Sequence, residues 1–312
     1  MIRIAYLGPE GTFTEAALMD IVAAGLIPEQ GPDAEIQKVP IDSTPGALDA
    51  VRDGRADYAC VPIESSIDGS VTPTLDSLSI GSPLQVFAET TLDVAFSIVV
   101  RPGYGAPDVR TLAAFPVALA QVRKWLAVEL PGAEPRPAYS NADAARQVAE
   151  GNADAGVTSP LAATRWGLPV LADGVVDEPN ARTRFLLVGP PGSPPPRTGA
   201  DRTSVVLRID NSPGALVAAL TEFGMRGIDL TRIESRPTRT GLGTYVFFAD
   251  CVGHLDDGAV AEALKALHRR CADVRYLGSW PTGSAAGVLP PPSDEASRWL
   301  AQLRGNPERI EP

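Results

Sequence analysis

The sequence predicts an α/β protein in which two α/β lobes enclose a cleft and a smaller ferredoxin-like unit follows them. Strand-like and helix-like segments alternate through residues 2–188, and this alternation favours sheets rich in parallel pairs and covered by helices. A proline-rich stretch at 190–199 then interrupts the chain. Beyond it, the apolar pattern gives the order βαββαβ over residues 201–280, which is the split ferredoxin-like arrangement.

The alternation is clearest at the start of the chain. Apolar runs at 2–7, 36–41 and 58–63 predict strands, and the segments at 12–24 and 45–52 predict helices between them. Further along, the predicted elements are a strand-like run at 90–100, a helix at 116–129, a strand at 135–139, a helix at 142–150, a strand at 153–157, a helix at 160–166 and a strand at 184–188. Ligands of open α/β sheets bind at the carboxyl ends of strands, so the site is expected in the strand-to-helix loops.

The smaller unit and the domain limits follow from the same patterns. Strands are predicted at 204–209, 228–235, 245–250 and 273–277, and helices at 213–225 and 258–270. The expected domains are 1–190, with lobes of about 1–90 plus 180–190 and of 91–179, a stiff proline-rich linker at 191–200, the smaller unit at 201–280 and a tail at 281–312. One more amphipathic helix is expected in the tail at 293–304.

Composition and charge narrow the function. The chain has 312 residues, of which 44% are hydrophobic and 21% charged, and this is ample for sizeable cores. Its formal net charge of -11 argues against binding to nucleic acid or anionic membranes, because both need basic surface. The N-terminal apolar run is too short for a signal peptide, and no stretch approaches the roughly twenty apolar residues of a membrane helix. Three widely spaced cysteines are typical of free thiols in a reducing compartment, so a cytoplasmic protein is expected.

Four segments of the larger unit occur in the order found in one enzyme family. They are GPEGTFTEAA at 8–17, VPIESSIDGSV at 61–71, TLD at 74–76 and ARTRF at 181–185. Each is weak alone, but together they are specific, and the chain resembles the prephenate dehydratase family. The smaller unit resembles the ACT domain, a small-molecule sensor, through NSPGAL at 211–216 and IESRP at 233–237. The resemblance covers residues 2–280.

The resemblance implies both a fold and a reaction. The family's catalytic domain has two α/β lobes with a cleft, like periplasmic binding proteins, and it converts prephenate to phenylpyruvate with release of water and carbon dioxide. No cofactor and no metal are expected. His254 and His268 are the two histidines of the sequence, and neither has carboxylate or cysteine ligands at metal spacing. The loop at 8–11 is too short for a phosphate-binding loop and lacks its lysine.

The Thr-Arg-Phe motif supplies the central candidate. Thr183 corresponds to the threonine that the family needs, so its hydroxyl is expected to donate a hydrogen bond to the departing oxygen, and such assistance is typically worth roughly 10²- to 10⁴-fold. From spacing alone, Thr183 is better explained as an ordinary β-branched strand residue. Arg184 and Phe185 are expected to bind substrate. Strand alternation places Arg184 opposite Thr183 unless a twist or bulge intervenes.

Two loops supply the other expected groups. Thr12 and Thr14 begin a helix directly after a glycine-containing loop, where free N–H groups can bind an anion, although Thr12 could instead only cap its helix. Ser66 and Glu64 follow a strand and are candidate catalytic groups, with Ser65 as a substrate ligand. Glu64 could be a second proton donor if burial raises its pKa, or it could only accept hydrogen bonds from its loop.

Two departures from the family pattern bear on the mechanism. The family's common Glu-Asn-Ser is Glu64-Ser65-Ser66 here, so a hydrogen bond of the asparagine amide is lost or bridged by water. Many members carry His-Pro where this chain has Phe115-Pro116, so a mechanism that relies on that histidine is excluded.

For the smaller unit, the resemblance implies phenylalanine as an effector that inhibits from a distance. The expected effector residues are Asn211, Ser212, Pro213, Gly214, Ala215, Leu216, Glu234, Ser235, Arg236 and Pro237. The N–H groups of a helix start can hold an amino-acid carboxylate, and plain helix capping is the alternative. Such pockets usually form between paired subunits, so a homodimer or a dimer-of-dimers tetramer is implied.

Two other functions stay open. Arogenate, the aminated analogue of prephenate, differs at one side-chain pocket that the sequence does not resolve. A non-catalytic small-molecule binding protein is the second alternative, because two lobes around a cleft are also its plan. A secreted protein of that kind is expected to carry an export signal, and it has no obvious use for a sensor unit.

Overall fold

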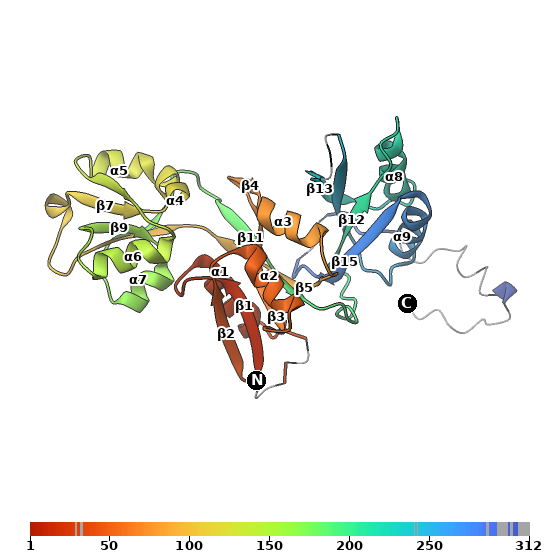
Figure 1. The fold of residues 1–312 in the computed structure, drawn as a ribbon, viewed down its shortest axis with the longest axis horizontal. Helices are drawn as coiled ribbons and strands as arrows, with labels where there is room; N and C mark the ends of the chain where they lie inside the picture. Colours follow the sequence, from red (N-terminus) through yellow and green to blue (C-terminus); the bar gives the residue numbers. More distant parts are fainter. Residues whose placement is uncertain are drawn as a thin grey trace. The chain divides into compact units, whose positions relative to one another are not determined.

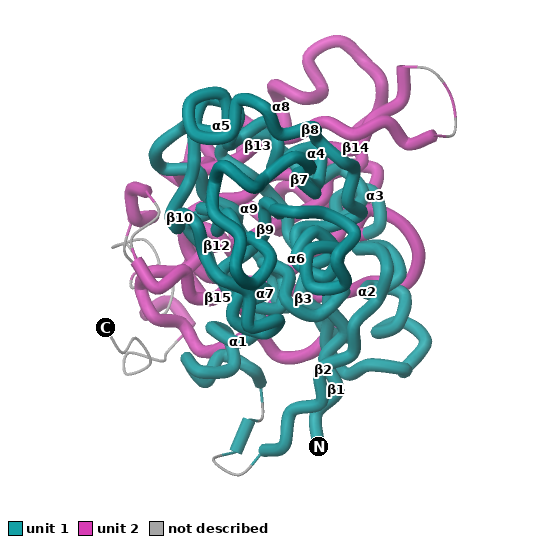
Figure 2. Tube along the Cα trace, turned by 90° about the vertical axis from the view of Figure 1, so that its left-hand side faces the viewer, with its two compact units in different colours: residues 1–77, 89–190 teal, residues 78–88, 191–312 magenta. Residues whose placement is uncertain are grey.

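The computed structural model describes residues 1–28, 30–31, 34–239, 241, 243–284, 287–291, 299 and 302–304. The chain forms two compact units, which Figure 2 distinguishes by colour. The first comprises Met1–Ser77 with Glu89–Pro190, and the second comprises Leu78–Ala88 with Pro191–Pro312. Most of the helix predicted at 293–304 lies outside the described residues. No helix of the described chain is long and apolar enough to cross a membrane.

The first lobe is built on a mixed sheet with the strand order β2-β1-β3-β11-β5 and the short β4 beside β3 (Figure 1). Its strands are β1 (Ile2–Leu7), β2 (Ile36–Ile41), β3 (Tyr58–Ser65), β4 (Gly69–Ser70), β5 (Gln85–Asp93) and β11 (Arg182–Gly189). Its helices are α1 (Phe13–Ala23), α2 (Thr44–Arg52) and α3 (Thr72–Ser79). Strand β1 pairs parallel with β2 and β3, whereas β11 returns antiparallel to β3.

The second lobe has its own mixed sheet, in the order β10-β6-β9-β7-β8. Its elements are β6 (Phe96–Val100), η1 (Ala106–Asp108), β7 (Thr111–Ala114), α4 (Pro116–Gln121), α5 (Arg123–Glu129), β8 (Glu134–Pro137), α6 (Asn141–Ala149), β9 (Ala155–Thr158), α7 (Pro160–Trp166) and β10 (Val170–Val175). Buried side chains such as Ile98, Leu112 and Val157 form its core. The chain passes between the lobes twice, after β5 and after β10, and the predicted pair of α/β lobes is confirmed.

Several predicted elements differ from the structure. The apolar run at 90–100 is two strands in two sheets, β5 and β6, because each side pairs with different partners and the Val94 N–H donates to the Ala181 carbonyl at 2.7 Å. The helix predicted at 116–129 is interrupted at Val122, which is fully buried and not helical (φ -122°, ψ 11°). Helix α3 and strand β10 were not expected. Their partners are distant in sequence, so local periodicity gives a weak signal for them.

The second unit has the predicted βαββαβ order. Its elements are β12 (Asp201–Arg208), α8 (Ala215–Gly224), β13 (Leu230–Pro237), β14 (Tyr245–Val252), α9 (Gly258–Arg270) and β15 (Asp273–Pro281). The strands form one antiparallel sheet in the order β13-β14-β12-β15. Phe223 on α8 and Leu267 on α9 are buried against Val205 and Leu207 of β12. The two helices therefore cover one face of this sheet.

The proline-rich stretch is bonded to the second unit along its length. His254 accepts the Asp256 N–H at Nδ1, so its Nε2 carries the proton and donates to the Pro195 carbonyl at 3.0 Å. Arg197 pairs with Asp257 at 2.7 Å. These contacts fix the stretch to this unit.

Candidate active site

A cavity of about 400 Å³ lies in the first unit and takes its lining from both lobes. Its polar lining residues are Thr14, Ser65, Asp68, Ser70, Thr72, Gln121, Asn141, Arg182 and Thr183. Aromatic side chains of Phe13, Phe96, Phe115 and Phe185 and the side chain of Val94 supply much of the apolar wall. A polar rim with an apolar wall is the usual make-up of a small-molecule site.

Strand β11 presents Thr183 and Phe185 to this cavity, as strand alternation requires for residues two apart. Thr183 lies opposite Ser65 in the β11–β3 pairing. Arg184 lies opposite Glu64, and a register shift follows it. The two hydroxyl groups predicted at the ends of neighbouring strands are thus brought to one wall of the cavity.

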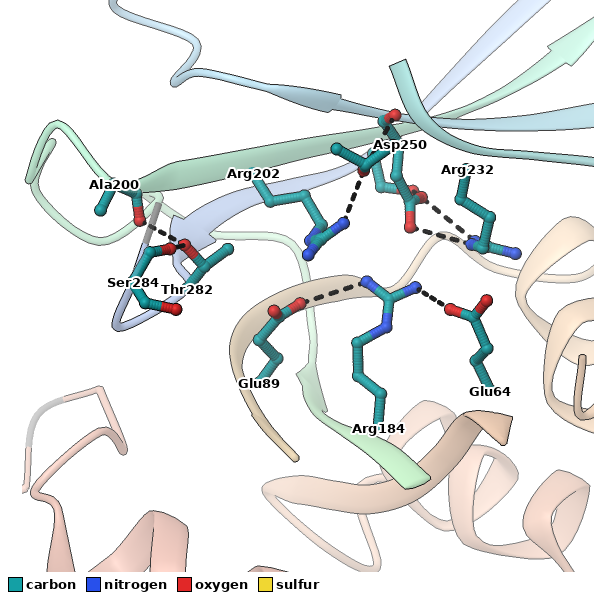
Figure 3. A network of polar contacts seen from close by, with 11 residues as sticks. Glu64, Glu89, Arg184, Ala200, Arg202, Arg232, Asp250, Thr282 and Ser284 are labelled. Carbon is teal, nitrogen blue, oxygen red and sulfur yellow. Dashed lines mark hydrogen bonds and ion pairs between the residues drawn. The ribbon is translucent and has the colours of Figure 1, made fainter. Parts of the chain in front are cut away.

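Arg184 and Glu64 do not line the cavity. The guanidinium of Arg184 lies between two carboxylates, with Nη2 at 3.1 Å from Glu64 Oε2 and Nη1 at 3.3 Å from Glu89 Oε2 (Figure 3). The side chains of Arg184 and Glu89 are buried, whereas that of Glu64 is 42% exposed, so the pair with Glu89 is the one shielded from water. Together these pairs hold the strand beside Thr183. The predicted role of Arg184 in binding substrate stays a prediction, and its contacts indicate a positioning role.

The Glu64–Ser66 loop is held by its own hydroxyl groups. Ser65 Oγ accepts hydrogen bonds from the N–H groups of Ile67 and Asp68, each at 3.2 Å. Ser66 Oγ donates to the Asn180 carbonyl at 3.3 Å and accepts the Arg182 N–H at 2.9 Å. Ser66 therefore binds the backbone that leads into Thr183. Ser65, which stands where the family commonly has asparagine, bonds the backbone of the next residues of its own loop.

At the start of α1, Thr12 serves as the helix cap. Its Oγ donates to the Leu7 carbonyl at 2.9 Å and accepts the Glu15 N–H at 3.3 Å. Thr14, in the first turn of the helix, is buried and lines the cavity. The structure thus shows the capping alternative for Thr12 and places Thr14 at the site.

Glu15 links the two lobes beside the cavity. Its carboxylate is fully buried and accepts hydrogen bonds from Gly11 N–H at 2.6 Å, Lys38 Nζ at 2.5 Å and Arg165 Nη1 at 2.9 Å. Burial alone would raise the pKa of Glu15, but the hydrogen bonds from Lys38, Gly11 and Arg165 outweigh it and lower that pKa. Arg165 belongs to α7 of the second lobe, so one charged cluster joins both lobes.

Two further contacts join the lobes at the cavity. The rings of Phe13 and Phe96 meet edge to face, with centroids 5.7 Å apart. Gln121 Nε2 donates to Asp68 Oδ2 at 3.2 Å. These residues come from α1 and the β3–β4 loop on one side and from β6 and α4 on the other.

Three helices begin at the cavity wall. Phe13 and Thr14 lie in the first turn of α1, Thr72 and Pro73 in that of α3, and Asn141 in that of α6. The free N–H groups and dipoles of helix starts stabilise anions. Among the described lining residues, Arg182 is the one cation and Asp68 the one carboxylate. The lining can therefore hold an anion with little formal positive charge.

Gln121, Asn141 and Arg182 line the cavity, although their motifs did not predict them as site residues. The side-chain oxygens of Gln121 and Asn141 are buried and make no hydrogen bond within the described chain. Gln121 is the last residue of α4, and Asn141 is the first residue of α6, directly after the cap residue Ser140. Their positions at helix ends were the feature of the sequence that could have indicated them as site residues.

A second cavity, of about 370 Å³, lies in the second unit. Among its lining residues are Arg208, Asp210, Asn211, Ser212, Ala215, Leu216, Thr238, Thr244, Tyr245, Phe247 and Ala272. Four of the expected effector residues, Asn211, Ser212, Ala215 and Leu216, are thus brought together at the start of α8. Pro213, Gly214 and the β13 residues at 234–237 are not part of this lining.

Comparisons with known proteins decide the family. A family model for prephenate dehydratase matches residues 4–193, and one for the ACT domain matches residues 203–269. The prephenate dehydratase of Mycobacterium tuberculosis is 79% identical over 310 residues, covering 99% of this chain and 96% of that protein. The chain belongs to the prephenate dehydratase family. The predicted family and enzyme class, a hydro-lyase, are confirmed.

Solved structures of the family agree with this fold. The prephenate dehydratase of Arthrobacter aurescens, crystallised with L-Phe, superposes with a TM-score of 0.85 and 40% identity, covering 97% of this chain and 98% of that one. A structure described as a quorum quenching acylase gives a TM-score of 0.78 at 30% identity, covering 89% of this chain and 97% of that one. The fold therefore accompanies more than one described activity, so the site must carry the functional argument.

No group of three or more His, Cys, Asp or Glu side chains that could hold a metal ion occurs in the described part of the chain. The expectation that the enzyme uses no cofactor stays a prediction.

Proposed function

We propose that the chain converts prephenate to phenylpyruvate in the cavity between the lobes, with Thr183 as the hydrogen-bond donor to the leaving hydroxyl. The observation that carries this proposal is the position of Thr183 on the cavity wall, opposite Ser65 and beside three helix starts. In the reaction, the electron pair of the bond to the departing carboxylate enters the ring, and the C–O bond at the opposite ring carbon breaks. Carbon dioxide leaves, and the departing hydroxide takes a proton and becomes water.

The cavity lining suits each part of this substrate. The helix starts of α1, α3 and α6, with Arg182, can hold the carboxylate that remains in the product. The apolar wall formed by Phe13, Phe96 and Phe115 suits the ring. This wall destabilises the charged carboxylate of the substrate more than it destabilises the neutral carbon dioxide into which that carboxylate is converted. The carboxamides of Gln121 and Asn141 can bind the polar groups of the substrate because each has an oxygen without a partner in the described chain.

The residues around Thr183 act by holding it. Arg184 is fixed between Glu64 and Glu89, and Ser66 binds the backbone of Asn180 and Arg182. Preorganisation of this kind lets a hydroxyl of ordinary acidity assist a leaving group. Direct catalytic roles for Glu64 and Ser66 stay predictions.

The test is a pair of substitutions at Thr183. Thr183→Ala removes the hydroxyl and is expected to lower turnover of prephenate by at least about a hundredfold, in line with general-acid assistance. Thr183→Ser keeps the hydroxyl and is the matched control, and it should retain much more activity. Equal rates for both variants and the wild type would remove Thr183 from the mechanism.

For the second unit, L-phenylalanine is the proposed effector. The lining of the second cavity suits a zwitterionic aromatic amino acid: Arg208 can pair with its carboxylate, Asp210 with its ammonium group, and Leu216, Tyr245 and Phe247 can contact its ring. The relative from Arthrobacter aurescens was crystallised with this amino acid. Binding there inhibits the enzyme by favouring a less active conformation.

Self-association through the second units is also proposed, as a homodimer or a dimer of dimers. Three large apolar residues of the second unit are exposed in the single chain: Val217 in α8, Met225 at the C-terminal end of α8, and Ile233 in β13. Apolar side chains of this size favour burial against a second copy.

Arogenate is the alternative substrate that one observation favours. Asp68 lines the cavity and could pair with the ammonium group that arogenate carries in place of the keto group of prephenate. Comparison of kcat/KM for the two substrates decides between them. Asp68→Asn should then lower kcat/KM for arogenate selectively if Asp68 faces that group.

A further inference from the structure

The chain crosses between the two units three times, within helix α3, within strand β5 and directly after Pro190. Helix α3 begins in the first unit and ends in the second, because Leu78–Ala88 belongs to the second unit. Strand β5 then begins in the second unit and ends in the first. Any change in how the segment at 78–88 is held must therefore reach both elements.

Arg275 of β15 holds this segment by its backbone. Its Nη1 donates to the carbonyls of Leu78 at 3.1 Å and Ile80 at 3.0 Å, and its Nη2 donates to Gly81 at 3.0 Å. A cation is favoured at a helix C-terminus, and this one satisfies carbonyls that the helix leaves free. Three residues on, a Cβ at Gly278 would lie 2.4 Å from the Val86 carbonyl oxygen, so β15 also packs directly on the start of β5.

The other ends of α3 and β5 lie at the active site. Thr72 and Pro73 in the first turn of α3 line the catalytic cavity. Glu89 and Asp93 of β5 pair with Arg184 at 3.3 Å and Arg182 at 2.6 Å, the two residues that flank Thr183. Helix α3 thus begins at the cavity wall, and β5 ends against the two arginines beside the proposed donor.

The near end of β15 lies at the effector cavity. Ala272, directly before β15, lines that cavity, and so does Arg208, which pairs with Asp273 at the start of the strand. Arg275 follows Ala272 by three residues, which is about 10 Å along a strand. Helix α3 has 8 residues, which gives it a length of about 12 Å.

We propose that Arg275 is a positioning residue that couples the effector cavity to the catalytic cavity through α3 and β5. An effector that shifts the start of β15 moves the Arg275 guanidinium, and this alters its hold on the C-terminal end of α3 and on the segment that leads into β5. Coupling through such a packed, hydrogen-bonded route requires that the effector favour one arrangement of it. The inference rests on the proposed role of L-phenylalanine as the effector.

The test uses the full chain with Arg275→Met, which keeps much of the side-chain stem and removes the donors. Turnover without effector, and the Kd for L-phenylalanine measured by calorimetry, should stay within about threefold of wild type. Inhibition by saturating L-phenylalanine should fall to less than about a third of its wild-type extent, because only the coupling between the two cavities is lost. Arg275→Lys keeps the charge but has fewer hydrogen-bond donors, so it should lose an intermediate share of the inhibition. Arg269→Met, at an exposed arginine of α9, is the matched control and should be inhibited like wild type.

Wild-type inhibition of Arg275→Met and Arg275→Lys would overturn the coupling role alone. A wild-type enzyme that neither binds nor responds to L-phenylalanine would overturn the proposed effector, and this inference with it.

Discussion

The ion pair between Glu15 and Arg165 offers a quantitative test of how the lobes are joined. Arg165 reaches both oxygens of Glu15, at 2.9 and 3.2 Å, and the Glu15 side chain is fully buried. Breaking a buried pair costs about 3–5 kcal/mol when a charge is left unpaired. In Arg165→Met, Lys38 and the Gly11 N–H still serve Glu15, so the expected loss is smaller, about 2 kcal/mol.

Urea denaturation followed by tryptophan fluorescence measures this loss, with Glu15→Gln and the double variant completing a double-mutant cycle. A coupling energy of at least about 1 kcal/mol is expected for residues in direct contact. Arg123→Met, at an exposed arginine of the same lobe as Arg165, should change the free energy of unfolding by less than about 0.5 kcal/mol. A coupling energy near zero would refute the idea that this pair joins the lobes.

Of two further predictions, one concerns the same junction and the other concerns the buried carboxylates Glu15 and Asp143. Gly11 has φ +89°, and a Cβ there would lie 2.9 Å from Ala162 Cβ. Gly11→Ala should therefore lower the free energy of unfolding by about 1–3 kcal/mol and raise KM for prephenate. Gly25→Ala is the control, because Gly25 has φ +67° with nothing within 4 Å of its Cβ position, so this variant should show only the backbone strain. The pKa values of Glu15 and Asp143 are lowered by their hydrogen bonds despite burial, so their contribution to stability is present above the unfolded pKa values of about 4 and is lost as pH falls through the folded ones. Urea midpoints should therefore hold between neutral pH and about 5 and fall below about 4.5, with a smaller fall in Glu15→Gln, and a midpoint that rises on acidification would contradict this assignment.

The parts of the fold that the sequence predicted are those with local causes. Thr12 caps its helix, as one of the two alternatives held, because a side-chain cap needs only residues three apart. Alternation along β11 separated Thr183 from Arg184 for the same reason. The break between β5 and β6 was missed because an apolar run has the same pattern whether it enters one sheet or two.

The site was predicted in part for a related reason. Thr14, Ser65, Thr183 and Phe185 lie on the cavity wall as their motifs implied. The pairing of Glu15 with Arg165 joins residues 150 apart, and the hold of Arg275 on Leu78 joins residues 197 apart. Contacts of this separation depend on the finished packing, and neither spacing nor composition encodes them.

Formation of phenylpyruvate from prephenate by the purified full-length chain, with and without L-phenylalanine, tests the central claim most directly. We expect rapid product formation that persists with a chelator present and declines as L-phenylalanine is added. Absence of product from prephenate would contradict it, and turnover of arogenate in the same assay would then identify the substrate that the cavity accepts.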